Sequence, residues 1–369
     1  MPVISATPLS CTPLSCTPIA ARAVGAAEQT WGEAMVESLR ARYLSMDAWL
    51  NANPAVETEL LARMQPGEYL HTTFGPPGQN KTECDFLFVL TATGDITSGG
   101  TITKSGDALR WDIDGSVYTQ DNLPAHTLGA GDGIITVSTT DGRDGVTAIS
   151  IISKLIAGDI SFVAALTNAT HLQIESCDAE LDVAALQNNT ALERLFLNNT
   201  LAYGDGGAAF APLVNLLTLQ YHTTDVATDI SELATLTKLT NLRINDTPAT
   251  GDIVSLYVLS DLTAIIVSRT DIGCSSGVMN WPAIRSISLD NSWTQPEVDA
   301  FVNALYILWV SGLTYATPTC YIGGSNAAPS GTYQAANPPT TPLEKIYTMV
   351  NDNTSTGNNT FSSFTYTTP

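Results

Sequence analysis

The sequence is poor in positive charge. It contains 15 Lys and Arg residues against 36 Asp and Glu residues, which gives a formal net charge of −21 at pH 7. Nucleic acids and anionic membranes are bound through clustered Lys and Arg side chains that displace counterions. The composition therefore excludes nucleic acid and anionic membrane as main partners, and it favours a protein that resists aggregation.

The sequence also lacks long apolar runs and zinc-ligand spacings. No stretch of about 18 or more apolar residues occurs, so we expect no membrane insertion. Residues 1–24 do not resemble a secretory signal, because they lack a basic start and an uninterrupted apolar stretch. The six cysteines are scattered without a C-x-x-C pair, so we expect neither metal nor cofactor. Cys177 and Cys274 are predicted to be small buried thiols.

Short catalytic motifs are absent as well. The chain has no G-x-S-x-G, no Walker loop, no H-E-x-x-H and no G-x-G-x-x-G that opens a helix. His171 and His222 would need an acidic partner within hydrogen-bond reach to act in acid–base catalysis, and Glu175 is the only carboxylate expected near them. We therefore predict no catalytic residues and no enzymatic activity.

What the sequence does contain is a stretch, residues 158–296, that repeats six times at a spacing of about 23 residues. The fourth copy reads Leu236-x-x-Leu239-x-x-Leu242-x-Ile244, and the other copies keep most of this skeleton. The pattern resembles the leucine-rich repeat family, whose unit is a short strand followed by a helical or irregular return segment. The resemblance implies a solenoid over residues 143–296, in which stacked units share one core and each end is capped.

The closing L-x-L of each copy predicts a row of outward side chains. Strand alternation sends the two leucines inward and the residue between them outward. This row, with two flanking histidines, is our candidate binding face: Gln173, Phe196, Gln220, Arg243, Ile266, Ser288, His171 and His222. A binding surface for protein or glycan and an idle solvated surface fit the pattern equally well, although solenoid faces are commonly used for binding.

The region before the repeats is predicted to hold three segments. Residues 1–28 form an extended arm in which Thr-Pro-Leu-Ser-Cys occurs twice, and residues 29–66 show helical spacing of apolar residues. We expect residues 1–64 to anchor the chain to other subunits, and the chain to be a homo-oligomer. The candidate anchoring residues are Cys11, Cys16, Trp31 and Trp49.

Residues 80–142 alternate short strand signals with turn residues, which predicts a small antiparallel β-sandwich. Leu109-Arg110-Trp111-Asp112-Ile113-Asp114-Gly115, followed by His126, resembles the polycystic-kidney-disease-type (PKD) domain, an immunoglobulin-like fold. Ile113 replaces the family's Phe, and Leu128 stands where its Tyr is expected. We expect His126 to be a structural hydrogen-bonding residue.

Three carboxylates of this region, Asp112, Asp114 and Asp132, raise the question of a calcium site. Carboxylates clustered on turns suit a hard cation. Their spacing does not match the loop of an EF-hand, and capping of local Asx turns explains them more simply.

Residues 297–369 are predicted to form an α/β cap at the other end of the solenoid. Thr294 and Glu297 have capping-box spacing ahead of an amphipathic helix, and Thr341 and Glu344 repeat that spacing. A strand is expected after each helix, at residues 319–322 and 361–367.

The chain is therefore predicted to be a multidomain α+β protein. The resemblance to leucine-rich repeat and PKD-type domains implies binding rather than turnover. Our hypothesis is a virion-attached interaction protein, on a phage head or tail, that displays the repeats for host-surface adhesion. A decoration or cement protein of the capsid and a bacterial surface adhesin are the alternatives, so the expected location is the virion or the bacterial cell surface.

Overall fold

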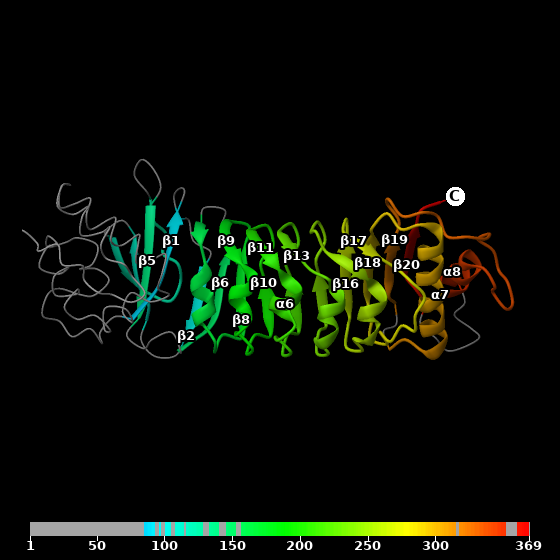
Figure 1. Ribbon diagram of the computed structural model, residues 1–369, viewed down its shortest axis with the longest axis horizontal. Coiled ribbons are helices and arrows are strands. Elements are labelled where there is room, and N and C mark those ends of the chain that lie inside the picture. Colours follow the sequence, from blue (N-terminus) through cyan, green and yellow to red (C-terminus); the bar gives the residue numbers. More distant parts are fainter. Residues whose placement is uncertain are drawn as a thin grey trace, which may run out of the picture.

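The computed structural model describes part of the chain. The described residues run from 85 to 368, except for 93–95, 97–99, 105–107, 114–115, 128–132, 140–144, 153–155, 315–316 and 352–359. The predicted arm and helical segment, with Cys11, Cys16, Trp31 and Trp49, lie outside the described residues. Figure 1 shows the described elements stacked along one long axis, with β1 and β5 near one end and α7 and α8 at the other.

One sheet, which we call the front sheet, runs along the molecule. It has ten strands among the described residues, in the order β2-β6-β8-β10-β12-β14-β16-β18-β19-β20. All neighbours are parallel except the antiparallel pair β2 and β6. The strands are β2 (Gly100–Lys104), β6 (Val146–Ile152), β8 (His171–Glu175), β10 (Arg194–Phe196), β12 (Thr218–Gln220), β14 (Asn241–Arg243), β16 (Ala264–Ser268), β18 (Ser286–Asp290), β19 (Thr319–Ile322) and β20 (Ser363–Tyr366).

A second sheet lies on the other side of the core. Its described strands follow the order β13-β11-β9-β7-β1-β5-β3-β4, and a separate parallel pair, β15 and β17, continues the series of repeats. The strands are β1 (Asp85–Ala92), β3 (Arg110–Ile113), β4 (Ser116–Thr119), β5 (Gly133–Thr139), β7 (Ile156–Asp159), β9 (Asp178–Asp182), β11 (Leu201–Asp205), β13 (Asp225–Ala227), β15 (Thr250–Asp252) and β17 (Asp271–Gly273).

Short helices return the chain from the second sheet to the front sheet. They are η3 (Ser161–Ala165), η4 (Val183–Leu186), α6 (Gly206–Phe210), η5 (Ile230–Thr235) and η6 (Ile253–Val258). An aspartate precedes each helix, and its carboxylate accepts a hydrogen bond from a backbone N–H of the first turn. The recurring Asp-apolar step of the repeats is therefore a helix cap, which satisfies a backbone donor that the helix leaves unpaired. The aspartates are Asp159, Asp182, Asp205, Asp229 and Asp252.

In two repeats, the strand on the second-sheet side has a glycine just before the capping aspartate, and the cap of the preceding repeat requires it. Gly204 has φ of 104°, and a Cβ at this position would lie 2.6 Å from Oδ1 of Asp182 in the preceding repeat. Gly251 has φ of 106° and meets Asp229 in the same way. A side chain at either position would be strained by its backbone conformation and would displace a capping carboxylate.

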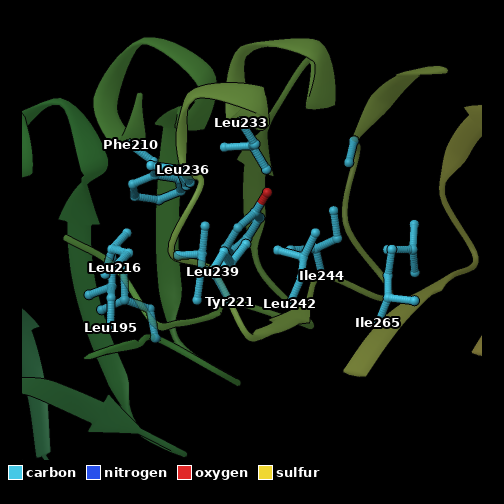
Figure 2. Close-up of a cluster of buried hydrophobic side chains, with 14 of the residues drawn as sticks. Leu195, Phe210, Leu216, Tyr221, Leu233, Leu236, Leu239, Leu242, Ile244 and Ile265 are labelled. Carbon is cyan, nitrogen blue, oxygen red and sulfur yellow. The ribbon is translucent and has the colours of Figure 1, made fainter. Parts of the chain in front are cut away.

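The repeat leucines fill the space between the sheets and the short helices. Leu236, Leu239 and Leu242 have no exposed surface, and Figure 2 shows them in one interior with Leu195 of the second copy and Ile265 of the fifth. Burial of each such side chain stabilises the fold by roughly 1.5–3 kcal/mol. The leucines are core residues, as predicted, and the stacked repeats form the solenoid that the repeat pattern predicts.

The third copy places a tyrosine where the other copies have an aliphatic residue. Tyr221 is fully buried, and its ring lies 5.3 Å from that of Phe210, centroid to centroid. Its hydroxyl donates a hydrogen bond to Oγ1 of Thr228 at 2.8 Å. Since the hydroxyl has a partner, the core accepts this polar group without the cost of an unsatisfied donor.

Both sheets of the amino-terminal region continue into the repeats. Strand β2 pairs with β6, which in turn pairs in parallel with β8 of the first copy. Strand β1 pairs with β5 on one side and with β7 on the other. The strands expected between residues 80 and 142 are present, with β4 in addition, and they close the end of the solenoid core by continuing its layers.

In this region the expectation for His126 is confirmed and the expectation for Asp112 is wrong. His126 is a structural residue, since its Nδ1 lies 2.9 Å from the hydroxyl of Tyr118. The expectation that Asp112 caps an Asx turn is wrong, because Asp112 is buried within β3, opposite Val117 of β4 and Thr136 of β5. Asp114 and Asp132 lie outside the described residues.

At the carboxyl-terminal end, β19 and β20 extend the front sheet beyond the sixth copy. Helix α7 (Gln295–Ser311) begins at a capping box formed by Thr294 and Glu297. Helix α8 (Pro342–Asn351) lies against it, and Lys345 donates a hydrogen bond to Asn303 of α7. These elements cover the last repeat.

Within the part of the chain that the structure describes, no helix is long and apolar enough to cross a bilayer. In the same residues, no group of three or more His, Cys, Asp or Glu side chains is placed to hold a metal ion. Cys177 and Cys274 are buried thiols, as predicted. Burial raises the pKa of Cys177 to about 11 and that of Cys274 to about 12.

Candidate binding face

The register of the front sheet brings the six predicted outward residues into one row. Gln173 of β8 is opposite Phe196 of β10, and the pairing continues through each parallel strand to Ser288 of β18. The row extends further than the sequence predicts, to Ser150 before it and to Tyr321 and Thr365 after it. These three belong to strands outside the regular copies, where only short apolar alternation, such as Cys320 and Ile322, signals the row.

The row is accessible but not fully solvated. Its six predicted members are all half-buried, whereas the apolar residues on either side of them point into the core. Arg243 is the one charged member among these six. A surface of partly buried, mostly uncharged side chains has the composition of the centre of a protein interface, where charged residues are depleted.

At the amino-terminal end of the row, the side chains contact one another. The rings of His171 and Phe196 lie 5.6 Å apart, centroid to centroid, at an angle of 32°. Ser150 donates a hydrogen bond to the amide oxygen of Gln173 at 2.9 Å. These contacts restrict the rotamers before any partner binds, and this lowers the entropy that binding must overcome.

In the middle of the row, polar side chains form hydrogen bonds both between neighbouring strands and within one repeat. The amide nitrogen of Gln220 lies 3.5 Å from Oδ1 of Asn241, and Nε of Arg243 donates to Oδ1 of Asn245 at 3.3 Å. Asn245 is buried, as is Asn198 in the equivalent position of the second copy. The polar position after the closing step is therefore less exposed in these two copies than strand alternation alone predicts.

His222 stands beside this row as a neutral imidazole at pH 7. Burial and the nearby guanidinium of Arg243 lower its pKa to about 4, and Asp246 opposes the shift. Its Nδ1 lies 3.3 Å from the hydroxyl of Thr223. Such a histidine contributes hydrogen bonding without charge between pH 5 and 8.

A polar cavity of about 330 Å³ opens at the carboxyl ends of β16 and β18 and was not predicted from the sequence. Arg269, Asp290, Asn291 and Ser325 contribute to its lining. The guanidinium of Arg269 binds the carboxylate of Asp246 through two nitrogens, and this hydrogen bonding lowers the pKa of Asp246. Because Arg269 is paired with Asp246, the residues that line the cavity offer no unpaired cation to an anionic ligand.

The remaining candidate residues are the four anchoring residues and the two histidines. Cys11, Cys16, Trp31 and Trp49 lie outside the described residues, so the anchoring site stays a prediction. His171 and His222 lie in β8 and directly after β12, two strands apart, and the structure does not bring them together.

No protein-family description matches the sequence, and no curated protein matches it significantly. Solved structures match it more remotely. An internalin (InlF) from Listeria monocytogenes is 16% identical, with a TM-score of 0.32, over 52% of this chain and 64% of that structure. The functional domain of InlJ from the same organism is 15% identical, with a TM-score of 0.37, over 63% and 55%.

A leucine-rich repeat protein from Leptospira interrogans is 14% identical, with a TM-score of 0.36, over 57% of this chain and 47% of that structure. The chain therefore spans less than two thirds of each of these three structures. At these identities the similarity concerns the fold alone.

Proposed function

We propose that this protein is a non-enzymatic adhesion module that binds a protein or glycan on a host surface through the front sheet. The observation that carries the proposal is the register-aligned row from Gln173 to Ser288, which is half-exposed, mostly uncharged and held in place by its own hydrogen bonds. Pre-organised side chains on a rigid sheet suit recognition, and nothing in the row is arranged for proton transfer.

The proposal includes an attachment to a larger assembly through residues 1–64. The repeated Thr-Pro-Leu-Ser-Cys arm and the helical spacing that follows it support such an anchor. The assembly that we favour is a phage virion, with this chain present as a homo-oligomer on its head or tail. A bacterial cell surface is the alternative location.

The test uses the full chain and compares binding to host cells and to arrayed glycans. The variant Phe196→Ser with Arg243→Ser removes the largest apolar and the charged member of the row. We expect it to weaken binding on the order of tenfold or more, with an unchanged melting temperature. The matched control is Val214→Ser, which changes an exposed side chain outside the row. Unaltered binding by the folded row variant would contradict the proposal.

A decoration or cement protein of a capsid is the second candidate, and the proline-rich arm favours it because such an arm suits an extended course over neighbouring subunits. The two candidates differ in what deletion of residues 1–64 does. If the deletion destabilises particles while the row variants bind like the wild type, the decoration role replaces adhesion.

A further inference from the structure

The outer side of the second sheet carries two exposed apolar side chains. On β11, Leu201 is 50% exposed and Tyr203 is 49% exposed, while Ala202 between them is buried. The neighbouring strands β9 and β13 lie on either side of β11 (Figure 1). Leu201 and Tyr203 therefore lie on a strand that has a neighbour on each side, and they point away from the core.

The residues around this pair are acidic. Leu201 is opposite Glu180 of β9, and Tyr203 lies between Asp182 of β9 and Asp225 of β13. We call Leu201, Tyr203 and the surrounding exposed carboxylates the acidic face. Its carboxylates are Asp159, Asp178, Glu180, Asp182, Asp205 and Asp225. Strands β7, β9, β11 and β13 contain neither Lys nor Arg.

The fold does not require an apolar side chain at these two positions, because adjacent repeats form the same strand with polar side chains at the equivalent positions. The register partners of Tyr203 are aspartates in both adjacent repeats, and the partner of Leu201 in β9 is a glutamate. Those strands form the same sheet with carboxylates exposed at these positions. The apolar pair therefore leaves about half of its surface in water without contributing to the shared core.

The surrounding charge decides what can cover the pair. Anionic lipid and nucleic acid are repelled by the carboxylates. A second copy of this chain, with a net charge of −21, is opposed in the same way. A protein surface that presents Lys or Arg around an apolar side chain is complementary in both charge and polarity.

We propose that the acidic face is a docking surface for a basic protein partner, with Leu201 and Tyr203 as its apolar anchors. An aromatic and an aliphatic anchor within a charged rim is the arrangement in which a few residues supply most of the binding energy. This surface lies on the second sheet and is separate from the front-sheet row, so one chain would hold two partners on different sides of its core.

The test uses the full chain and a labelled peptide, acetyl-Lys-Lys-Phe-Lys-Lys-amide, with Lys-Lys-Ser-Lys-Lys as its apolar-to-polar control. The variant Leu201→Glu with Tyr203→Asp introduces the residue types found at the register partners, so it should fold, with a melting temperature lowered only slightly by repulsion between the added and the neighbouring carboxylates. It also adds two negative charges. Attraction by charge alone would strengthen binding to this variant, whereas loss of the anchors weakens it.

We expect the Phe peptide to bind the wild type more tightly than the Ser peptide, and the double variant to lose affinity for it on the order of tenfold. The control variant, Val214→Glu with Val258→Asp, adds the same charge at exposed sites elsewhere and should not weaken binding. Equal binding of the two peptides, or equal or tighter binding by the anchor variant, would overturn the proposal. Phe196→Ser should leave peptide binding unchanged, which separates this result from the adhesion proposal.

Discussion

The front sheet and the second sheet are built by the same repeats over the same core, yet their outer sides differ in chemistry. The central row of the front sheet has one charged residue, Arg243, among its six predicted members. The acidic face of the second sheet has six carboxylates and no cation on its four strands. The leucines fix the backbone on both sides, so the outward residues of each sheet are free to change independently of one another.

The largest effect is expected where both sheets depend on the core. Leu242 of the front sheet and Val226 of the second sheet have no exposed surface. We expect Leu242→Asp and Val226→Asp each to destabilise the solenoid by about 5 kcal/mol or more, because each buries an unpaired charge. Thermal unfolding followed by circular dichroism measures this. If only one of the two substitutions lowered the melting temperature, the two sheets would not share one cooperative core.

A smaller effect on stability is expected for the aspartate caps, which lie between the second-sheet strands and the short helices. Asp229→Ala removes the carboxylate that accepts a hydrogen bond from the backbone N–H of Ser231, and should cost about 1 kcal/mol. This bond lowers the pKa of Asp229, so its contribution is complete at neutral pH, begins to fall below the ordinary carboxyl pKa, and is lost as the pH falls through the lowered pKa of the folded state. Denaturant unfolding, with Asp225→Ala as a control that caps no helix, measures the difference.

On the front sheet, the pH dependence of stability comes from a histidine, His222, and not from a carboxyl group. The pKa of His222 is lowered from 6.5 to about 4, so the unfolded chain takes up this proton first as the pH falls. Stability from this group is therefore complete above pH 6.5 and decreases toward pH 4. Because the ring is partly exposed, we expect a loss of at most about 1 kcal/mol. His222→Gln should remove this part of the pH dependence, and identical pH profiles for the two proteins would contradict the assignment.

The smallest effect on stability is expected for the exposed ion pair in the loops that follow the front-sheet strands. Arg269 is paired with Asp246, but its side chain is 60% exposed. Exposed pairs contribute roughly 0.2–1 kcal/mol, so Arg269→Gln should change the free energy of unfolding by no more than this. Urea unfolding at low and high salt checks the prediction, and a larger loss would show that the pair does more than join two surface side chains.

The sequence predicted the front sheet well because its signal is repeated. The L-x-L steps specify which side of each strand is buried, and six copies specify the register of the row. The second-sheet strands of the repeats were not predicted, since they are only three to five residues long, as in β9 and β13. The alternation of Asp178, Glu180 and Asp182 was the available sign of an exposed strand.

The junction of the amino-terminal strands with the solenoid could not be predicted from local patterns. Strand β2 pairs with β6 across a separation of more than 40 residues, as the bond from Thr147 to Thr103 shows. Such pairing depends on which sheet edges remain open after the repeats stack. For the same reason Asp112 was expected in a turn, although β4 and β5 enclose it on both sides.

Because the repeats stack in parallel, the length of the solenoid is proportional to the number of repeats. In each sheet a repeat strand pairs only with the strands directly before and after it, so no contact in the array depends on the total number of copies. Adding or removing one copy would move the two ends relative to each other by about 4.8 Å, the spacing of neighbouring strands. The distance between the amino-terminal strands and the far end of the front sheet is thus set by how many times the unit is copied.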